Sequence, residues 1–331
     1  MQFKPLMPPR TQSEDGIERT VGFEFEFMGL KPREAAHVIV DTFGGTVSDD
    51  GPNAAIASTP DHGDFKVEID SRYAHAPQSD DATSVFDTVR RAGAEAFGAV
   101  TRGIVPCEIV TPPLPLSVLD QLPLLERRLA VAGATGTREN ALHAVGLHIN
   151  PQVVSTSPTW LVGVVRAQIL ASAWLKEAMQ IDVTRRLTGF AAPFDEAFIN
   201  RIMTPDYAPS HDTLIDDYLR LSPTRNTELD LLPLLAHLDA DRVRRALPDE
   251  KVRPRPTFHY RLPNAEIGNP NWSALREWNR WVLLEQIAAD DAFLAETSDA
   301  YRRARRGAVS GPWQAAFADR VIAWLQGASS R

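Results

Sequence analysis

The sequence predicts an α+β fold in which a sheet with one polar face is covered by helices on its other face. Segments in which apolar and polar residues alternate are typical of strands. Between them lie segments with apolar residues three and four positions apart, which are typical of amphipathic helices. The strand-like segments carry carboxylates and imidazoles at every second position, so these groups share one face of each strand. With 331 residues, 44% of them hydrophobic, the chain can also bury a sizeable core.

The first half of the chain alternates between these two patterns. Residues 20–27 (TVGFEFEF) alternate carboxylates with aromatic side chains, which predicts a strand. The apolar spacing of residues 33–43 predicts a helix that ends at Gly44 and Gly45, because glycine readily adopts the left-handed conformation of a helix end. The same patterns predict strands at residues 64–70, 105–110 and 144–150, and helices at residues 81–100 and 116–131.

The second half of the chain is predicted to be mainly helical. Its segments are helices at residues 160–179 and 229–238, a strand at residues 257–262, and helices at residues 273–305 and 313–325. No internal repeat or break in composition marks a domain boundary. We therefore expect a disordered leader at residues 1–15 and a single catalytic domain at residues 16–331, with a helical insertion at about residues 155–250.

Composition excludes several classes of protein. A formal net charge of -8 argues against a surface that neutralises nucleic-acid phosphates. The single cysteine, Cys107, excludes an internal disulfide and a multi-cysteine zinc site, and it fits a reducing cytoplasm. No segment approaches the roughly 18 to 20 apolar residues that span a bilayer, so no membrane association is expected.

The predicted strands share one design, with polar groups on one face and apolar groups on the other. Side chains two apart on a strand point the same way, so Glu24 and Glu26 lie side by side, roughly 7 Å apart. Phe23, Phe25 and Phe27 point to the opposite face. The polar face of the whole sheet would carry Glu24, Glu26, Lys66, Glu68, Asp70, Glu108, His148, Asn150, His259 and Arg261.

Several carboxylates that face one space repel each other and take up protons unless cations lie between them. Hard oxygen ligands suit Mg²⁺ or Mn²⁺, and a histidine ligand is compatible with either ion. The sequence therefore predicts a divalent metal site, whose ligands are Glu24, Glu26, Glu68, Glu108 and His148.

Three further groups on the same face suit a nucleotide that is bound through metal. Lys66 and Arg261 would meet phosphate oxygens, and Asn150 would add a polar contact. Neither a G-x-x-x-x-G-K-[ST] loop nor a G-x-G-x-x-G loop occurs, so the phosphates would have to be held through metal. Cys107 lies among apolar neighbours, where a buried and inert thiol is expected.

At these residues the chain resembles the amidoligase family, carboxylate-amine ligases related to glutamine synthetase and glutamate-cysteine ligase. The resemblance is spread over about three quarters of the chain. Its blocks are GFEFEF at residues 22–27, FKVEIDSRY at 65–73, CEIVTPPL at 107–114, GLHIN at 146–150, NTELDLLPL at 226–234 and FHYRLPN at 258–264.

The resemblance implies a glutamine-synthetase-like fold, with a curved, mainly antiparallel sheet, a polar concave face and helices packed on the outer face. It also implies ATP, two Mg²⁺ or Mn²⁺ ions, and attack of an amine donor on an acyl phosphate made from a small-molecule or peptide carboxylate. The family's late strand usually carries a carboxylate where this chain has His259. The metal shell is therefore expected either to be altered or to be completed by Glu266. The sequence does not determine the oligomeric state, and an oligomer is one of the states it allows.

Two other functions remain open from the sequence. A guanidino-type phosphotransferase resembles the same catalytic sheet and would yield a phosphorylated product without an amide. A binding protein that keeps the fold but not the chemistry is suggested by His259. Arg261 is equally suited to a structural ion pair, because its planar guanidinium pairs well with carboxylates.

Overall fold

The computed structural model describes residues 3–69, 105–137, 145–181, 191–248, 250, 252–307 and 312–329. Within them the chain is α+β with mainly antiparallel strand pairing, which confirms the predicted class. The chain forms two compact units. The first comprises Met1–Lys4, Val21–His148 and Asn264–Arg276, and the second comprises Pro5–Thr20, Ile149–Pro263 and Glu277–Arg331. Asp70 and the predicted helix at residues 81–100 lie outside the described residues.

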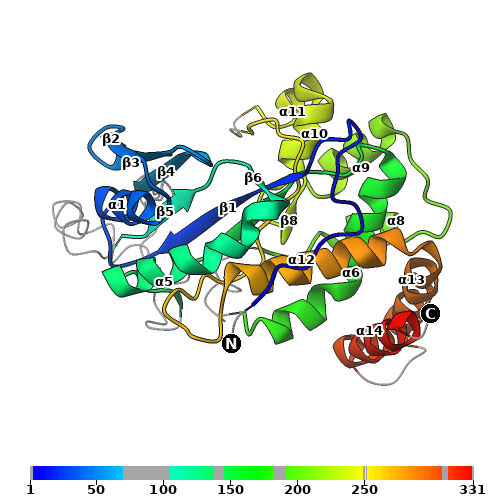
Figure 1. Ribbon diagram of the computed structural model, residues 1–331. Coiled ribbons are helices and arrows are strands. Elements are labelled where there is room, and N and C mark those ends of the chain that lie inside the picture. Colours follow the sequence, from blue (N-terminus) through cyan, green and yellow to red (C-terminus); the bar gives the residue numbers. More distant parts are fainter. Residues whose placement is uncertain are drawn as a thin grey trace, which may run out of the picture. The chain divides into compact units, whose positions relative to one another are not determined.

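The first unit is built on antiparallel strands in the order β2-β3-β4-β5-β1 (Figure 1). Their bounds are β1 (Thr20–Phe27), β2 (Thr46–Asp49), β3 (Ala54–Thr59), β4 (Gly63–Ile69) and β5 (Cys107–Val110). The short β6 (Leu114–Pro115) also pairs with β1. The strands predicted at residues 20–27, 64–70 and 105–110 are thus confirmed within a few residues.

One face of this sheet is covered because its side chains are apolar. Phe23, Phe25 and Phe27 of β1 are all fully buried, as the alternation predicts. Helix α1 (Pro32–Phe43) packs on β3, β4 and β5, and α5 (Leu122–Ala132), which follows the 3-10 helix Leu116–Gln121, packs beside α1 (Figure 1). Helix α1 ends at Gly44, as predicted, and the φ of 78° at this residue favours glycine, but its ψ of 174° differs from the left-handed helical conformation that was expected.

A buried carboxyl group on α5 holds the start of the next helix in the first unit. Glu126 Oε1 accepts hydrogen bonds from Ser273 Oγ at 3.1 Å and from the backbone amide of Ala274 at 2.8 Å. Ala274 is the first residue of α12 (Ala274–Ala289). Burial raises the pKa of Glu126 to about 7, and these two hydrogen bonds oppose the shift only in part.

Glu126→Gln is expected to reduce the loss of stability that occurs as the pH rises. The pKa of the folded group exceeds its ordinary value of 4.5, so its contribution is fully present below about pH 4.5 and is lost as the pH rises through 7. Glutamine keeps the oxygen acceptor and does not titrate. Between pH 5 and pH 8 the variant should lose roughly 2 to 3 kcal/mol less unfolding free energy than the wild type. Urea unfolding at the two pH values measures this. Glu34→Gln, at an exposed position, should lose as much unfolding free energy between the two pH values as the wild type does. A Glu126→Gln variant with the same loss as the wild type would refute the expectation.

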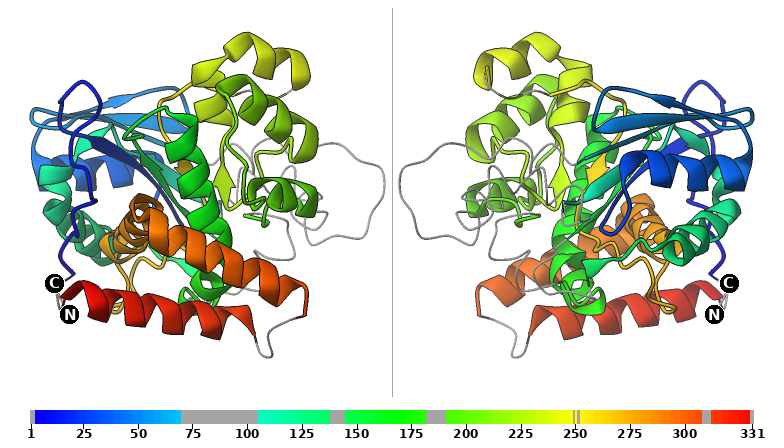
Figure 2. Two further views of the ribbon diagram at one scale, coloured as in Figure 1. Left: turned by 90° about the vertical axis from the view of Figure 1, so that its right-hand side faces the viewer. Right: turned by 90° about the vertical axis from the view of Figure 1, so that its left-hand side faces the viewer.

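The second unit is mainly helical. Its helices are α6 (Pro158–Ala178), α8 (Glu196–Ile202), α9 (His211–Leu221), α10 (Leu232–Leu238), α11 (Ala240–Ala246), the part of α12 after Arg276, α13 (Asp291–Arg305) and α14 (Trp313–Ser329). Helices α6, α13 and α14 pack together, and Figure 2 shows α13 and α14 side by side. The strands of this unit are β8 (Leu229–Asp230), β9 (His259–Tyr260) and the end of β7 (Leu147–Pro151).

Three predicted elements of this half differ from the structure in extent. The first two residues of the predicted helix at residues 229–238 form β8, because Leu229 and Asp230 pair with β9. The strand predicted at residues 257–262 is reduced to His259 and Tyr260. The helical stretch at residues 273–305 is divided at Asp290, whose side chain accepts a hydrogen bond from the Phe293 amide and so begins α13.

The segment that the sequence predicts as a disordered leader is described from Phe3 onward. Within the second unit, the backbone amide of Leu6 donates to Asn279 Oδ1 at 2.7 Å. The carbonyl oxygen of Leu6 accepts a hydrogen bond from Trp278 Nε1 at 2.9 Å. These partners lie far along the chain on α12 and could not be paired with Leu6 from sequence alone. Among the described helices, none combines the length and the apolar character needed to cross a bilayer.

Candidate metal centre

Three carboxylates lie in one row across the sheet of the first unit. In the antiparallel register Glu26 of β1 is opposite Glu108 of β5, and Glu108 is opposite Glu68 of β4. Residues directly opposite each other in such a pair have their Cβ atoms roughly 5 Å apart, and like charges there are destabilising. We call Glu26, Glu108 and Glu68 the acidic row. Its geometry arises because each strand places a carboxylate at the same height on the same face.

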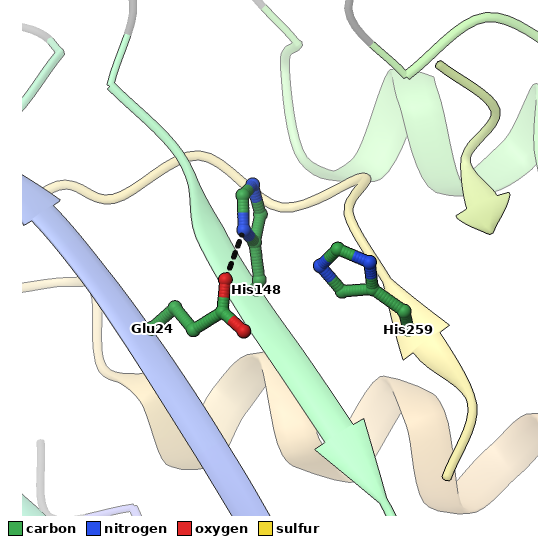
Figure 3. A group of neighbouring side chains, drawn as sticks. All are labelled: Glu24, His148 and His259. Carbon is green, nitrogen blue, oxygen red and sulfur yellow. Dashed lines mark hydrogen bonds and ion pairs between the residues drawn. The ribbon is translucent and has the colours of Figure 1, made fainter. Parts of the chain in front are cut away.

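His148 extends this polar face onto β7. Its Nδ1 lies 2.9 Å from Glu24 Oε2 (Figure 3). Its Nε2 lies 3.5 Å from Glu26 Oε1. A carboxylate can only accept, so Nδ1 carries the hydrogen that is shared with Glu24. In the neutral ring the lone pair is then on Nε2, the nitrogen nearer Glu26. Histidine ligands of metals are typically oriented in this way by a carboxylate on the other ring nitrogen.

Glu26, Glu108 and His148 form a group that could hold a divalent cation, and we call them the ligand group. One ligand atom from each lies within 4.8 Å of the others. Ligand atoms around one Mg²⁺ ion are at most roughly 4 Å apart, so only a small contraction would be needed. Glu26 Oε2 accepts a hydrogen bond from the Gly146 amide at 2.7 Å, which fixes the carboxylate. The donor set of two carboxylates and one imidazole therefore fits Mg²⁺ or Mn²⁺.

The burial of this group supports a cation as its partner. Glu26 and His148 are buried, and Glu108 is half-buried. Carboxylates that are removed from water are unfavourable unless a positive charge compensates them. Among the described residues, His148 lies near both Glu24 and Glu26, and a divalent cation is a further partner whose charge suits this group.

Two predicted residues of β4 lie on the same face and form an ion pair with each other. Lys66 Nζ lies 2.7 Å from Glu68 Oε2, and both side chains are partly exposed. Lys66 is opposite Val110 of β5, and Val110 is in turn opposite Glu24. An apolar position therefore separates the ammonium group from Glu24. Glu68 belongs to the acidic row, and the ligand group found among the described residues does not include it.

Glu266, expected to complete the metal shell, lies in the segment Asn264–Arg276 of the first unit. It is buried, and its Oε2 accepts a hydrogen bond from Asn269 Nδ2 at 2.6 Å. The ligand group defined among the described residues does not contain it.

The remaining predicted residues belong to the second unit. Arg261 is buried, donates from Nη1 to the carbonyl oxygen of Arg225, and lies 3.4 Å from Asn226 Oδ1. Asn150, on β7, is buried as well. His259, on β9, is drawn in Figure 3, and its Nδ1 lies 3.2 Å from Asp230 Oδ2.

Asp230 and Arg225 were not predicted as functional residues. Asp230 follows Glu228 at a two-residue spacing, which is the signal of a strand. The leucine-rich run that begins at Leu229 favours a helix over the same residues and obscured that signal. The expectation for Cys107 is met: the thiol is fully buried, and burial, followed by the charge of Glu108, raises its pKa far above the ordinary range.

Comparison with known proteins finds a family match that covers the candidate metal centre. A family model described as putative amidoligase enzyme matches residues 17–283. The match includes every residue of the acidic row and of the ligand group, and it includes Arg225, Asp230, His259 and Arg261. No curated protein and no solved structure matches the chain.

Proposed function

The chain belongs to the putative amidoligase enzyme family, and from that membership and the geometry of the ligand group we propose that it is an ATP-dependent ligase. The family indicates a ligase-type function that joins a carboxylate to an amine. The observation that carries the proposal is the ligand group itself, in which Glu26, Glu108 and His148 bring ligand atoms within 4.8 Å of one another. Metal-nucleotide chemistry needs such a set of oxygen and nitrogen donors.

In this proposal Glu26, Glu108 and His148 hold Mg²⁺ or Mn²⁺, and Glu24 keeps the His148 ring in place through Nδ1. A cation held there would offset the negative charge that develops during phosphoryl transfer. Resemblance to the family suggests a second ion, to which Glu68 and Glu266 remain candidate ligands. Lys66, Asn150 and Arg261 remain candidates for contacts with the nucleotide, because their cationic or amide groups can bind phosphate oxygens.

The proposed reaction has two steps. An oxygen of the substrate carboxylate attacks the γ-phosphorus of ATP, so that the bond to the β,γ-bridging oxygen breaks and an acyl phosphate and ADP form. The nitrogen of the amine then attacks the acyl carbon, phosphate leaves with the electron pair of the broken C–O bond, and the nitrogen loses a proton. The products are an amide, ADP and phosphate. The acceptor is proposed to be a small-molecule or peptide carboxylate.

Purified protein with ATP, Mg²⁺ or Mn²⁺, and pools of amino acids and peptides should release ADP and form an amide that mass spectrometry detects. Glu26→Gln should abolish ADP release, because an amide oxygen replaces a charged ligand. Glu34→Gln is a matched control, since Glu34 lies on the exposed part of α1 and glutamine can also serve at this helix position.

Three outcomes would contradict the proposal. Equal ADP release from the wild type and Glu26→Gln would separate the activity from the ligand group. A phosphorylated product without an amide would indicate guanidino-type phosphotransfer. Absence of turnover in broad pools, together with absence of Mg-ATP binding in calorimetry, would favour a binding protein that lacks the chemistry.

A further inference from the structure

The first unit contains a cavity between helix α5 and the segment that leads into α12. The volume of this cavity is about 760 Å³, within the range of roughly 300 to 1,000 Å³ that is usual for small-molecule sites. Helix α5 lines it with residues at three- and four-residue spacing, which share one helix face: Pro123, Glu126, Arg127, Ala130 and Val131. The other lining residues are Phe3 and residues 267–270, 272 and 273, and all of them belong to the first unit.

The cavity is separate from the candidate metal centre. Helix α5 packs beside α1, and α1 covers the face of the sheet that carries Phe65, with which Phe43 of α1 stacks. The acidic row lies on the opposite face of the same strands. Among the described lining residues, none comes from the acidic row or the ligand group. A ligand in this cavity would therefore occupy a second site.

Glu126 contributes a carboxyl group with one engaged and one available oxygen. In the described part of the chain, its hydrogen bonds from Ser273 Oγ and the Ala274 amide both go to Oε1. Oε2 can therefore accept a hydrogen bond from a ligand. Burial raises the pKa of Glu126 to about 7, and these hydrogen bonds and the charge of Arg127 oppose the rise only in part. A cationic group of a ligand beside Oε2 would favour the charged form of the carboxyl group.

Two hydrogen-bond donors line the same cavity. Trp272 is buried, and its Nε1 has no hydrogen-bond partner among the described residues. Such a group costs free energy unless it meets an acceptor, and buried indole N–H groups usually do so. Arg127 is exposed, and over the described ranges its guanidinium forms neither a hydrogen bond nor an ion pair. Both donors suit a carboxylate, whose two oxygens match the geometry of a guanidinium group.

We propose that this cavity binds an α-amino acid with a large apolar side chain. The ammonium group binds Glu126 Oε2, and the carboxylate binds Arg127 and Trp272 Nε1. The apolar side chain packs against Phe3 and covers Val131, which is 90% exposed and is stabilised by removal from water. A carboxylate alone would place a like charge beside Glu126, and an amine alone would leave both donors without an acceptor. The inference is independent of the proposed function, since this binding needs neither ATP nor metal.

Binding of this ligand should release protons near neutral pH. With a pKa of about 7, roughly half of the Glu126 carboxyl groups are protonated at pH 7 in the free protein. The ammonium group favours the carboxylate, so this proton leaves on binding, and affinity should rise about 10-fold between pH 6 and pH 8. Arg127 is the other charged side chain among the described lining residues. Calorimetry in two buffers with different ionisation enthalpies measures the released protons.

The test uses L-leucine and L-phenylalanine as probes, in the absence of ATP and metal. Calorimetry should show saturable binding of both to the wild type. Two analogues of leucine each lack one charged group: 4-methylpentanoate has no ammonium group, and 3-methylbutylamine has no carboxylate. Each analogue should bind at least about 10-fold more weakly than leucine, because it loses charge-assisted hydrogen bonds.

Glu126→Gln and Arg127→Gln should each lower the affinity for L-leucine at least about 10-fold, because each removes a charge that the ligand meets. Glutamine keeps the oxygen acceptor at position 126, and Arg127 is exposed, so both variants should fold. Arg128→Gln is the matched control. Arg128 is also exposed on α5, but it donates to the carbonyl oxygen of Asp41 and is not a lining residue. This variant should bind leucine as the wild type does.

Trp272→Phe removes the indole donor and keeps an aromatic ring. It should lower the affinity for L-leucine as well. The chain has seven tryptophans, and the indole signal that is missing from the nitrogen-15 NMR spectrum of this variant belongs to Trp272. In the wild type that signal should shift when L-leucine is added, because Nε1 gains an acceptor.

Absence of saturable binding of both amino acids would overturn the inference. Equal affinity for leucine and either analogue would do so too, because the ligand would then not be recognised as a zwitterion. Unchanged affinity in both Glu126→Gln and Arg127→Gln would place the ligand elsewhere, and an indole signal of Trp272 that does not shift would contradict the proposed contact. A protein that binds leucine in this way but forms no amide would refute the proposed function alone.

Discussion

Glu108→Gln is expected to stabilise the metal-free protein and to weaken its binding of divalent cations. Glu108 is the middle member of the acidic row, opposite Glu26 on one side and Glu68 on the other. Removal of its charge relieves two like-charge pairs, each of which costs about 0.2 to 1 kcal/mol. The same substitution removes a member of the ligand group, so metal affinity should fall at least about 10- to 100-fold, the loss typical of residues that only support a ligand.

Glu108→Gln should raise the stability of the metal-free protein and lower its gain in stability from metal, so the two effects can be measured separately. Urea unfolding in a chelator should show the variant more stable than the wild type. With Mn²⁺ at a hundred times the wild-type dissociation constant, the wild type should gain about 2.7 kcal/mol, and a variant that binds 100-fold more weakly should gain only about 0.4 kcal/mol. In the presence of Mn²⁺ the wild type would then be more stable than Glu108→Gln.

Glu68→Gln is the matched control for this prediction. It relieves the repulsion from Glu108 but also removes the ion pair with Lys66, so the net change in metal-free stability should be small. Since Glu68 lies outside the ligand group, its metal affinity should change less than that of Glu108→Gln. Equal losses of metal affinity in the two variants would contradict the assignment of ligands. A destabilised Glu108→Gln in chelator would contradict the repulsion.

Of the substitutions described above and below, Arg19→Met is expected to cause the largest loss of unfolding free energy. In the second unit Arg19 forms a two-pronged ion pair with Glu285, at 2.9 and 2.6 Å, and both side chains are only 1% exposed. Arg19 also donates to the carbonyl oxygen of Gln152, and Trp281 Nε1 donates to Glu285 at 2.8 Å. Without the arginine, the Glu285 charge stays buried and uncompensated, which should cost about 3 to 5 kcal/mol.

Urea unfolding at neutral pH measures this loss, and the double variant Arg19→Met with Glu285→Met shows its cause. Removal of both charges should recover a large part of the stability, because a buried ion pair replaced by apolar groups is often neutral. Arg320→Met is the control: its pair with Glu296 is exposed, so it should cost less than about 1 kcal/mol. A double variant as unstable as Arg19→Met would show that packing, not the unpaired charge, is responsible.

The parts of the site that were predictable from sequence are those determined by the period of a single strand. The alternation in residues 20–27 correctly predicted the strand, its buried phenylalanines and the shared face of Glu24 and Glu26. The register between strands depends on contacts between distant segments, so no local sequence pattern predicts it. The sequence therefore predicted an acidic face but not that Glu26, Glu108 and Glu68 share one row.

Contacts between distant segments were beyond prediction for the same reason. Arg19 and Glu285 are far apart along the chain, and nothing near either residue indicates the other. Asp230 was missed because its strand is only two residues long and merges into a leucine-rich helix. In each case the contact partner is distant in the sequence, and only the fold brings the two residues together.

Cys107 has a practical consequence. It is the only cysteine of the chain, it is fully buried, and its thiol resists ionisation, so maleimide reagents should leave it unmodified in the folded protein. A cysteine introduced at an exposed position would then be the sole site of labelling in a native background. One such position in each compact unit, for example at Arg33 and Asp241, would accept a pair of fluorophores. Energy transfer between them would report, during a titration with Mn²⁺ and ATP, how the two units respond to their ligands.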